Sequence, residues 1–150
     1  MFKISAASFV LMFVANGGVR SQIRTVQDPV FHFYLQDVAG LPALGPEDTS
    51  GYFTIGSTIS LAYDDGTSKY LNVASNSTAS YKALSLDEEA TTTNWGLEGD
   101  TIITTAPRQL NFLACATDDK EVYNVYLQEG NDTPEGKTCT LVTMHLPCLC

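Results

Sequence analysis

Positive charge is scarce in this sequence. Its 150 residues include 8 Lys and Arg against 17 Asp and Glu, which gives a formal net charge of −9. No cluster of basic residues occurs anywhere. Nucleic-acid binding needs cations that displace counterions from phosphates, and anionic membrane surfaces attract basic segments. We therefore expect neither nucleic acid nor membrane as a partner. The acidity is typical of a highly soluble protein.

Long apolar stretches are scarce as well. The one run of note covers about residues 4–15, behind Lys3, and is shorter than the roughly 20 residues of a membrane-spanning helix. A single cation, a short apolar run and small residues after it are typical of a signal peptide. We expect residues 1–21 to be removed after Ser21, with cleavage after Gly17 as the alternative. Residues 22–150 then form a single secreted domain of normal size.

Catalytic signatures are missing too. The chain has only two histidines, His32 and His145, and both are expected on strands facing solvent. No G-x-S-x-G nucleophile turn, EF-hand spacing or glycine-rich phosphate loop is present. We predict no enzymatic activity, no cofactor and no metal site. The many acidic residues keep one alternative open, a secreted glycoside hydrolase with two carboxylates in a cleft.

No long helical periodicity appears, and alternating patterns dominate. In residues 30–35, Phe31, Phe33 and Leu35 are expected on one face of a strand. Residues 40–46 and 75–80 read as loops, and Asp-Asp-Gly-Thr at 64–67 as a tight turn. Ser85 and Glu88 fit a capping box that would open one short helical turn. Further strands are expected at residues 53–55, 59–63 and 70–73, in a region that opens at Trp95, and at residues 110–115, 122–127 and 140–146.

These strands predict an all-β fold, a compact antiparallel β-sandwich or small barrel. Residues 53–59 resemble residues 95–102 at an offset of about 42 positions, and FYLQD at 33–37 resembles VYLQE at 125–129. A repeat of about this length also suits a β-trefoil, which is the alternative.

All four cysteines, Cys115, Cys139, Cys148 and Cys150, lie near the C-terminal end. With His145 they could bind zinc, but in a secreted protein cysteines usually form disulfides. We expect a Cys115–Cys139 bridge, with Cys115 to Cys148 or Cys150 as the alternative. In a plain meander Cys115 and Cys139 would lie at opposite ends of the sheet, so the segment between residues 128 and 138 must carry the chain back.

Two kinds of side chain could meet external glycans. Asn76 and Asn131 begin N-glycosylation sequons, although Pro134 behind the second should lower its use. Tyrosine rings on a β-scaffold can stack on sugars. The residues considered for stacking are Tyr34, Tyr63, Tyr70 and Tyr126; the alternative for each is a half-buried strand tyrosine. Trp95 is expected in the core.

The C-terminal half carries an ordered set of motifs between residues 94 and 146. A strand with Trp95 is followed by a strand ending in Ala-Cys115, an aromatic-x-Val-Tyr strand, a Gly/Pro loop and Gly-x-x-Cys139. This pattern resembles small secreted cell-wall proteins of filamentous fungi, the phialide-type (PhiA-like) family. It is similar, more distantly, to the C-terminal cysteine domain of yeast Pir cell-wall proteins.

The resemblance implies a glycosylated extracellular or cell-wall protein without catalytic residues. Cys115 and Cys139 correspond to family cysteines, and Cys148 or Cys150 to a terminal one. The glutamine-bearing repeats that couple Pir proteins to glucan are absent here, as is an upstream cysteine. Covalent attachment to the wall is therefore not expected from the resemblance.

The functional hypothesis is a secreted, non-enzymatic protein of the fungal cell surface or cell wall, with a structural or interaction role. Its partner would be a cell-wall polysaccharide or an extracellular protein. A lectin-like carbohydrate-binding module and a host-directed effector are alternatives, and a secreted glycoside hydrolase is a further one.

Overall fold

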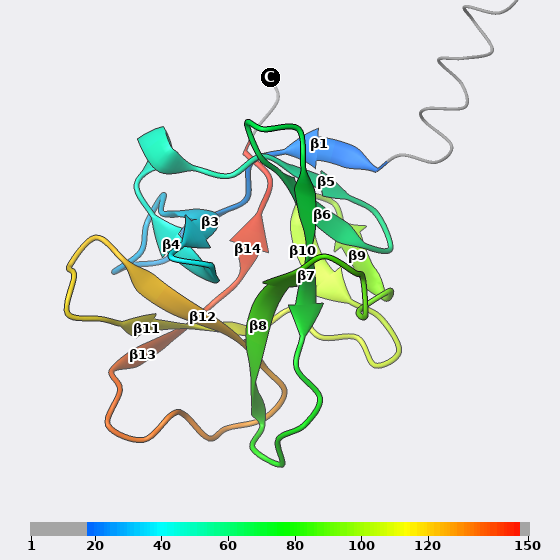
Figure 1. Cartoon of the computed structure of the whole chain (residues 1–150). Helices are drawn as coiled ribbons and strands as arrows, with labels where there is room; N and C mark the ends of the chain where they lie inside the picture. The colour runs from blue at the N-terminus through cyan, green and yellow to red at the C-terminus, as the bar shows by residue number, and fades with distance from the viewer. Residues whose placement is uncertain (1–17, 148–150) are drawn as a thin grey trace, which may run out of the picture.

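The computed structural model describes residues 18–147, and this part of the chain is all-β. Figure 1 shows antiparallel strands in one sheet that curls into a half-barrel. One short 3-10 turn, η1 (Glu47–Thr49), is the single helical element in this range. The strands are β1 (Val19–Ser21), β2 (Arg24–Thr25), β3 (Tyr34–Val38), β4 (Leu41–Gly45), β5 (Phe53–Ile55), β6 (Ile59–Ala62), β7 (Ser68–Val73), β8 (Tyr81–Asp87), β9 (Trp95–Glu98), β10 (Thr101–Thr104), β11 (Phe112–Ala116), β12 (Tyr123–Gln128), β13 (Cys139–Val142) and β14 (Met144–His145).

Most neighbouring strands in the sheet are also neighbours in sequence. Hairpins join β3 to β4, β5 to β6, β7 to β8, β9 to β10 and β11 to β12. β14 departs from this pattern, because it pairs with β2 on one side and with β10 on the other. The last strand of the described chain, β14, thereby joins β2 near the start of this chain to β10.

β12 is the strand that connects the two halves of the sheet. One of its edges pairs with β11 over five residues. The other edge is divided: residues 123–124 pair with β4, and residues 126–128 pair with β8. Val125, between these two contacts, has no partner strand on that edge.

The core fills the concave side of the sheet with side chains from almost every strand. Trp95 is 3% exposed, stacks on Phe112 with 6.5 Å between ring centroids, and donates its indole N–H to the Leu71 carbonyl at 3.0 Å. The expected role of Trp95 as a core residue is thus correct. Its indole ties β9 to β7 and β11, strands that are far apart in the sequence.

The tight turn expected at residues 64–67 is present, between β6 and β7. Gly66 adopts φ +89°, a conformation that side chains other than glycine rarely take. Asp65 Oδ1 accepts the Thr67 backbone N–H at 2.9 Å, as in an Asx turn. The Gly supplies the backbone geometry and the Asp fixes it.

The strand expected at residues 30–35 was wrong, because strand β3 begins only at Tyr34. Residues 27–33 form consecutive turns, in which Val30 N–H donates to the Gln27 carbonyl at 2.9 Å. Phe31 is 54% exposed, and His32 lies in a turn at φ +59° instead of on a strand. Pro29 has no N–H to offer a sheet partner, so the apolar alternation here was misleading.

Two further local predictions were wrong. The loop expected at residues 40–46 contains β4, where Pro42 is tolerated because its missing N–H falls at a weakly paired edge. The helical turn expected from Ser85 is part of β8. Leu84 and Leu86 are buried with the period of a strand, and pairing with β7 outweighs the local capping signal.

The N-terminal cleavage site expected after Ser21 falls at the end of β1. This strand pairs with β5 through Val19↔Ile55, Arg20↔Thr54 and Ser21↔Phe53. Cleavage after Ser21 would remove β1, whereas cleavage after Gly17 would keep it. Residues 1–17 of the expected signal peptide lie outside the described residues. Within residues 18–147, no helix has the length and apolarity needed to cross a membrane.

Replacing Trp95 by Phe should lower the free energy of unfolding by about 1–3 kcal/mol, because the Leu71 carbonyl loses its donor and the smaller ring leaves a void. Urea denaturation followed by circular dichroism measures this. The control Tyr52→Phe, at a 48% exposed residue, should change the value by less than about 0.5 kcal/mol. Equal stability of Trp95→Phe and the control would contradict the assigned role.

Candidate functional site

The disulfide joins Cys115 in β11 to Cys139 in β13, the pairing favoured from the sequence. The two cysteines face each other in the strand register. Because β12 occupies one edge of β11, residues 129–138 carry the chain back so that β13 can pair with the other edge. This return path resolves the difficulty that a plain meander would pose. Cys148 and Cys150 lie outside the described residues.

A buried glutamine holds this return loop in place. Gln128 is 3% exposed and donates from Nε2 to the Asp132 carbonyl at 2.6 Å. Its Oε1 accepts the Ser80 hydroxyl and the Gly130 N–H, both at 2.8 Å. Hydrogen bonds from Ser80 also hold the pKa of the Asp132 carboxyl below its usual value. The loop is therefore anchored to the start of β8.

Gln36 in β3 has an equivalent role. It is 5% exposed, donates from Nε2 to the Pro46 carbonyl at 2.9 Å, and accepts the Thr49 hydroxyl at 2.6 Å. Gln36 and Gln128 stand at the same place in the related sequences FYLQD and VYLQE. The repeat is visible in the sequence, and it marks two buried polar anchors for loops.

The tyrosines considered for sugar stacking differ in their surroundings. Tyr34 is 3% exposed and accepts a hydrogen bond from Arg24, so its ring offers no surface and that prediction was wrong. The hydroxyl of Tyr63 donates to Asp37 Oδ2 at 2.6 Å; burial first, and then this carboxylate, raise the pKa of the tyrosine. Tyr70 is half-buried in β7. Tyr126 is half-buried and lines a hollow.

Both predicted glycosylation asparagines lie on the surface. Asn76 is exposed in the loop between β7 and β8. Asn131 is exposed in the return loop, although Pro134 behind its sequon is buried. Their side chains are accessible to an enzyme that attaches glycans, and modification itself remains a prediction.

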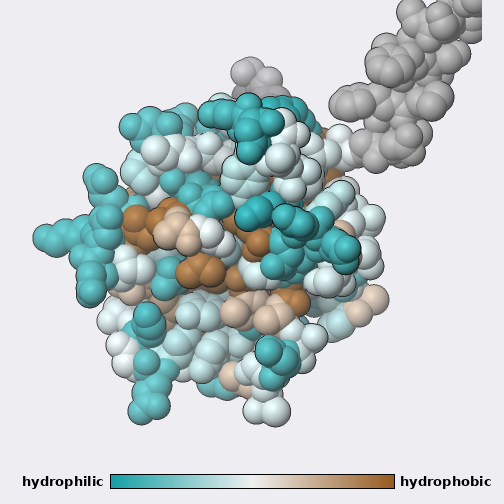
Figure 2. All heavy atoms as spheres, viewed as in Figure 1, coloured by the Kyte–Doolittle hydropathy of each residue, from teal (hydrophilic) through white to brown (hydrophobic). Residues whose placement is uncertain are grey.

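Two hollows share Asn124 in their linings. The first, of about 110 Å³, lies where β4 and β8 separate along the divided edge of β12. Besides Asn124 it is lined by Leu41, Pro42, Ala83, Leu84, Val125 and Tyr126. Figure 2 shows hydrophobic residues gathered at the centre of this face, over β4, β8 and β12. The second, of about 360 Å³, is polar and is lined by Asn124 with Ala116, Thr117, Asp118, Gly136, Lys137 and Thr138.

Two other hollows lie on different parts of the surface. One, of about 380 Å³, is lined by residues that include Lys82, Asn94, Thr104 and Glu129. Another, of about 310 Å³, lies over the disulfide and includes Asn131 and Leu141. Neither is lined by any of the four tyrosines considered for stacking.

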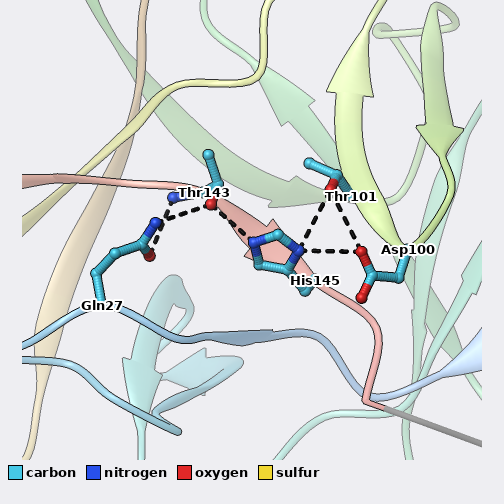
Figure 3. A network of polar contacts seen from close by, with 5 residues as sticks. All are labelled: Gln27, Asp100, Thr101, Thr143 and His145. Atoms are coloured by element: carbon cyan, nitrogen blue, oxygen red, sulfur yellow. Dashed lines mark hydrogen bonds and ion pairs between the residues drawn. The ribbon is translucent and has the colours of Figure 1, made fainter.

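His145 lies within a row of hydrogen-bonded polar side chains (Figure 3). Its Nδ1 lies 3.2 Å from Asp100 Oδ1, and its Nε2 lies 2.7 Å from the Thr143 hydroxyl. Gln27 Nε2 donates to that hydroxyl at 2.9 Å, and Thr101 Oγ1 lies 3.3 Å from Nδ1. The carboxylate only accepts, so Nδ1 donates toward Asp100, and in the tautomer with hydrogen on Nδ1 alone Nε2 can accept from the Thr143 hydroxyl.

The order hydroxyl, imidazole, carboxylate is that of a hydrolase triad. Here, however, the Thr143 hydroxyl is also held by Gln27, and none of the hollows described above is lined by His145. The row instead joins three segments: Gln27 after β2, Asp100 in the β9–β10 turn, and β14. Within residues 18–147, no group of three His, Cys, Asp or Glu side chains is placed to hold a metal ion.

Comparison of the chain with protein-family models, curated proteins and solved structures gives no match.

Replacing Cys115 and Cys139 together by Ala should lower the free energy of unfolding by about 3 kcal/mol, since the bridge closes a separation of 24 residues. Urea denaturation of the oxidised proteins measures the difference. In reductant the wild type loses the same bridge, so the two proteins should then unfold at similar urea concentrations. A difference that persists in reductant would mean that the substitutions act through packing.

Replacing Asp100 by Asn tests the His145 row. The His145 hydrogen bond lowers the pKa of Asp100 in the folded state. Its stabilisation is therefore present above the unfolded pKa of about 3.9 and is lost as the pH falls through the folded value. Because Asp100 is exposed, we expect Asp100→Asn to cost less than about 1 kcal/mol at pH 6, and we expect this cost to shrink as the pH falls through the folded value.

Thermal unfolding from pH 2 to pH 7 measures this dependence. Glu88→Gln is the control with the same change of charge, because Glu88 is exposed and makes no side-chain hydrogen bond within residues 18–147. A pH dependence that is the same in both variants would indicate a general charge effect instead of the His145 contact.

Proposed function

We propose that this protein is secreted and acts outside the cell as a structural or interaction protein of the cell surface or cell wall. The observation that carries the proposal is the Cys115–Cys139 disulfide. Disulfides form and persist in oxidising compartments and are rare in the cytosol. The exposed sequon asparagines Asn76 and Asn131 agree with passage through a secretory route.

A role without catalysis fits the surface better than a hydrolase does. Glycoside hydrolysis uses two carboxyl groups about 5–10 Å apart across a cleft. The hollow of about 380 Å³ has one carboxylate in its lining, Glu129, and the polar hollow at Asn124 has one, Asp118. The other two have none. The polar row at His145 makes contacts within the fold.

The resemblance of residues 94–146 to PhiA-like proteins extends the proposal to a fungal cell-wall context. The acidic composition favours uncharged or basic partners over nucleic acid and anionic membranes. A cell-wall polysaccharide or an extracellular protein fits this charge, and a neutral polysaccharide also fits the uncharged lining of the apolar hollow.

Expression of the full chain in a filamentous fungus tests the proposal. We expect the protein in the medium or the wall fraction, shortened at its N-terminus, with a mass gain of two hydrogens for each bridge on reduction. Asn76→Gln and Asn131→Gln variants separate the glycan contributions to the mass. Retention inside the cell at the full-length mass would overturn the proposal.

A further inference from the structure

The two hollows share Asn124 in their linings and differ in chemistry, and we consider them together. We call the pair the Asn124 groove; its apolar half is lined by Leu41, Pro42, Ala83, Leu84, Val125 and Tyr126, and its polar half by Ala116, Thr117, Asp118, Gly136, Lys137 and Thr138. The two linings place apolar side chains next to hydrogen-bonding groups.

The groove is a consequence of strand pairing. β4 and β8 share one edge of β12 and separate opposite Val125, where small residues, Ala43 and Ala83, stand at the two flanking pairs. On the polar side, the disulfide fixes β13 directly after Thr138, and the Ala116 N–H donates to the Thr138 carbonyl at 2.9 Å. Both walls are thus held by the sheet.

The apolar half includes the ring of Tyr126, which packs against a second tyrosine. Tyr126 packs edge-on against Tyr81 with 5.6 Å between ring centroids. Leu41 beside it is 58% exposed, and no charged residue lines this half. An aromatic ring with aliphatic neighbours can receive the C–H face of a pyranose ring, and the Tyr hydroxyl adds a polar end.

The polar half presents groups that the protein itself does not use. The side chains of Asn124, Asp118 and Lys137 make no hydrogen bond within residues 18–147. Thr117, by contrast, donates to backbone carbonyls and holds its loop. An amide, a carboxylate and an ammonium group supply both donors and acceptors, and the two charges cancel. Such a set suits a ligand with many hydroxyl groups and no net charge.

The hollow of about 380 Å³ is less suited to a ligand, although its volume is close to that of the polar half of the Asn124 groove. Lys82 Nζ donates to the Ser77 carbonyl at 2.6 Å, the Thr92 hydroxyl accepts the Val73 N–H at 2.8 Å, and Asn94 donates to the Thr105 carbonyl. Three of its polar side chains are therefore used in contacts within the fold, whereas the side chains of Asn124, Asp118 and Lys137 in the Asn124 groove make no hydrogen bond within residues 18–147.

We propose that the Asn124 groove binds an uncharged oligosaccharide, with one sugar ring on Tyr126 and hydroxyl groups bonded to Asn124 and Asp118. This inference rests on the proposed extracellular function and names its partner as a neutral glycan. The groove is too small for a stable protein interface, which buries about 800 Å² on each partner. Polyanionic glycans are disfavoured by the net charge of −9.

The test uses the full chain purified from the medium. Its retention on insoluble β-1,3-glucan, chitin and mannan is measured, followed by titration calorimetry with soluble oligomers of the glycan that retains it. We expect Asn124→Ala and Tyr126→Ala each to weaken binding at least tenfold, and Tyr126→Phe to bind nearly as well as the wild type. Lys82→Ala, in the other hollow, is the matched control and should bind normally.

Thermal unfolding of each variant separates loss of binding from loss of fold. If Tyr126→Ala fails to fold, the exposed substitution Asp118→Asn replaces it, with the same expected direction. The proposal is overturned if the wild type binds none of the three glycans, or if Lys82→Ala weakens binding as much as Asn124→Ala. A protein found in the medium or wall that binds no glycan refutes the groove alone, whereas retention in the cell refutes the proposed function.

Discussion

Pairing along both edges of β12 is the constraint on which the rest of the structure depends. β11 takes one edge, so β13 can reach β11 only on its far side, and this arrangement brings Cys115 opposite Cys139. β4 and β8 divide the other edge, so β12 joins two N-terminal hairpins to the C-terminal strands, and β14 makes a second connection through β2. The disulfide, the return loop and the Asn124 groove all follow from this one set of backbone hydrogen bonds.

Two buried glutamines, Gln36 and Gln128, hold loops against the sheet. A buried amide is favourable only when its donors and acceptors are satisfied. Gln36 and Gln128 meet this requirement by bonding loops: Gln36 bonds the segment after β4, and Gln128 bonds the segment after its own strand, β12. Each holds an irregular segment in place through side-chain hydrogen bonds.

Several of these features could be predicted from the sequence and others could not. The Asp-Gly turn, the strands with strict alternation and the core position of Trp95 depend on local patterns, so they were predicted. Residues 27–33 share the apolar alternation of a strand, but Pro29 and successive turns interrupt it. The capping pattern at Ser85 is local and was outweighed by pairing with β7. The Asn124 groove depends on which strands share an edge of β12, and no local pattern specifies that.

The contact between β2 and β14 also bears on how the chain folds. Gln27 and Thr143, which are hydrogen-bonded beside these strands, stand 116 positions apart in the sequence. Contacts of such separation require a long loop to close before they return any stabilisation, so they slow folding. Until β14 has been synthesised, β2 lacks this neighbouring strand. The hairpins formed by the intervening residues must therefore be stable without it. Completion of the sheet therefore has to wait until β14 has been synthesised.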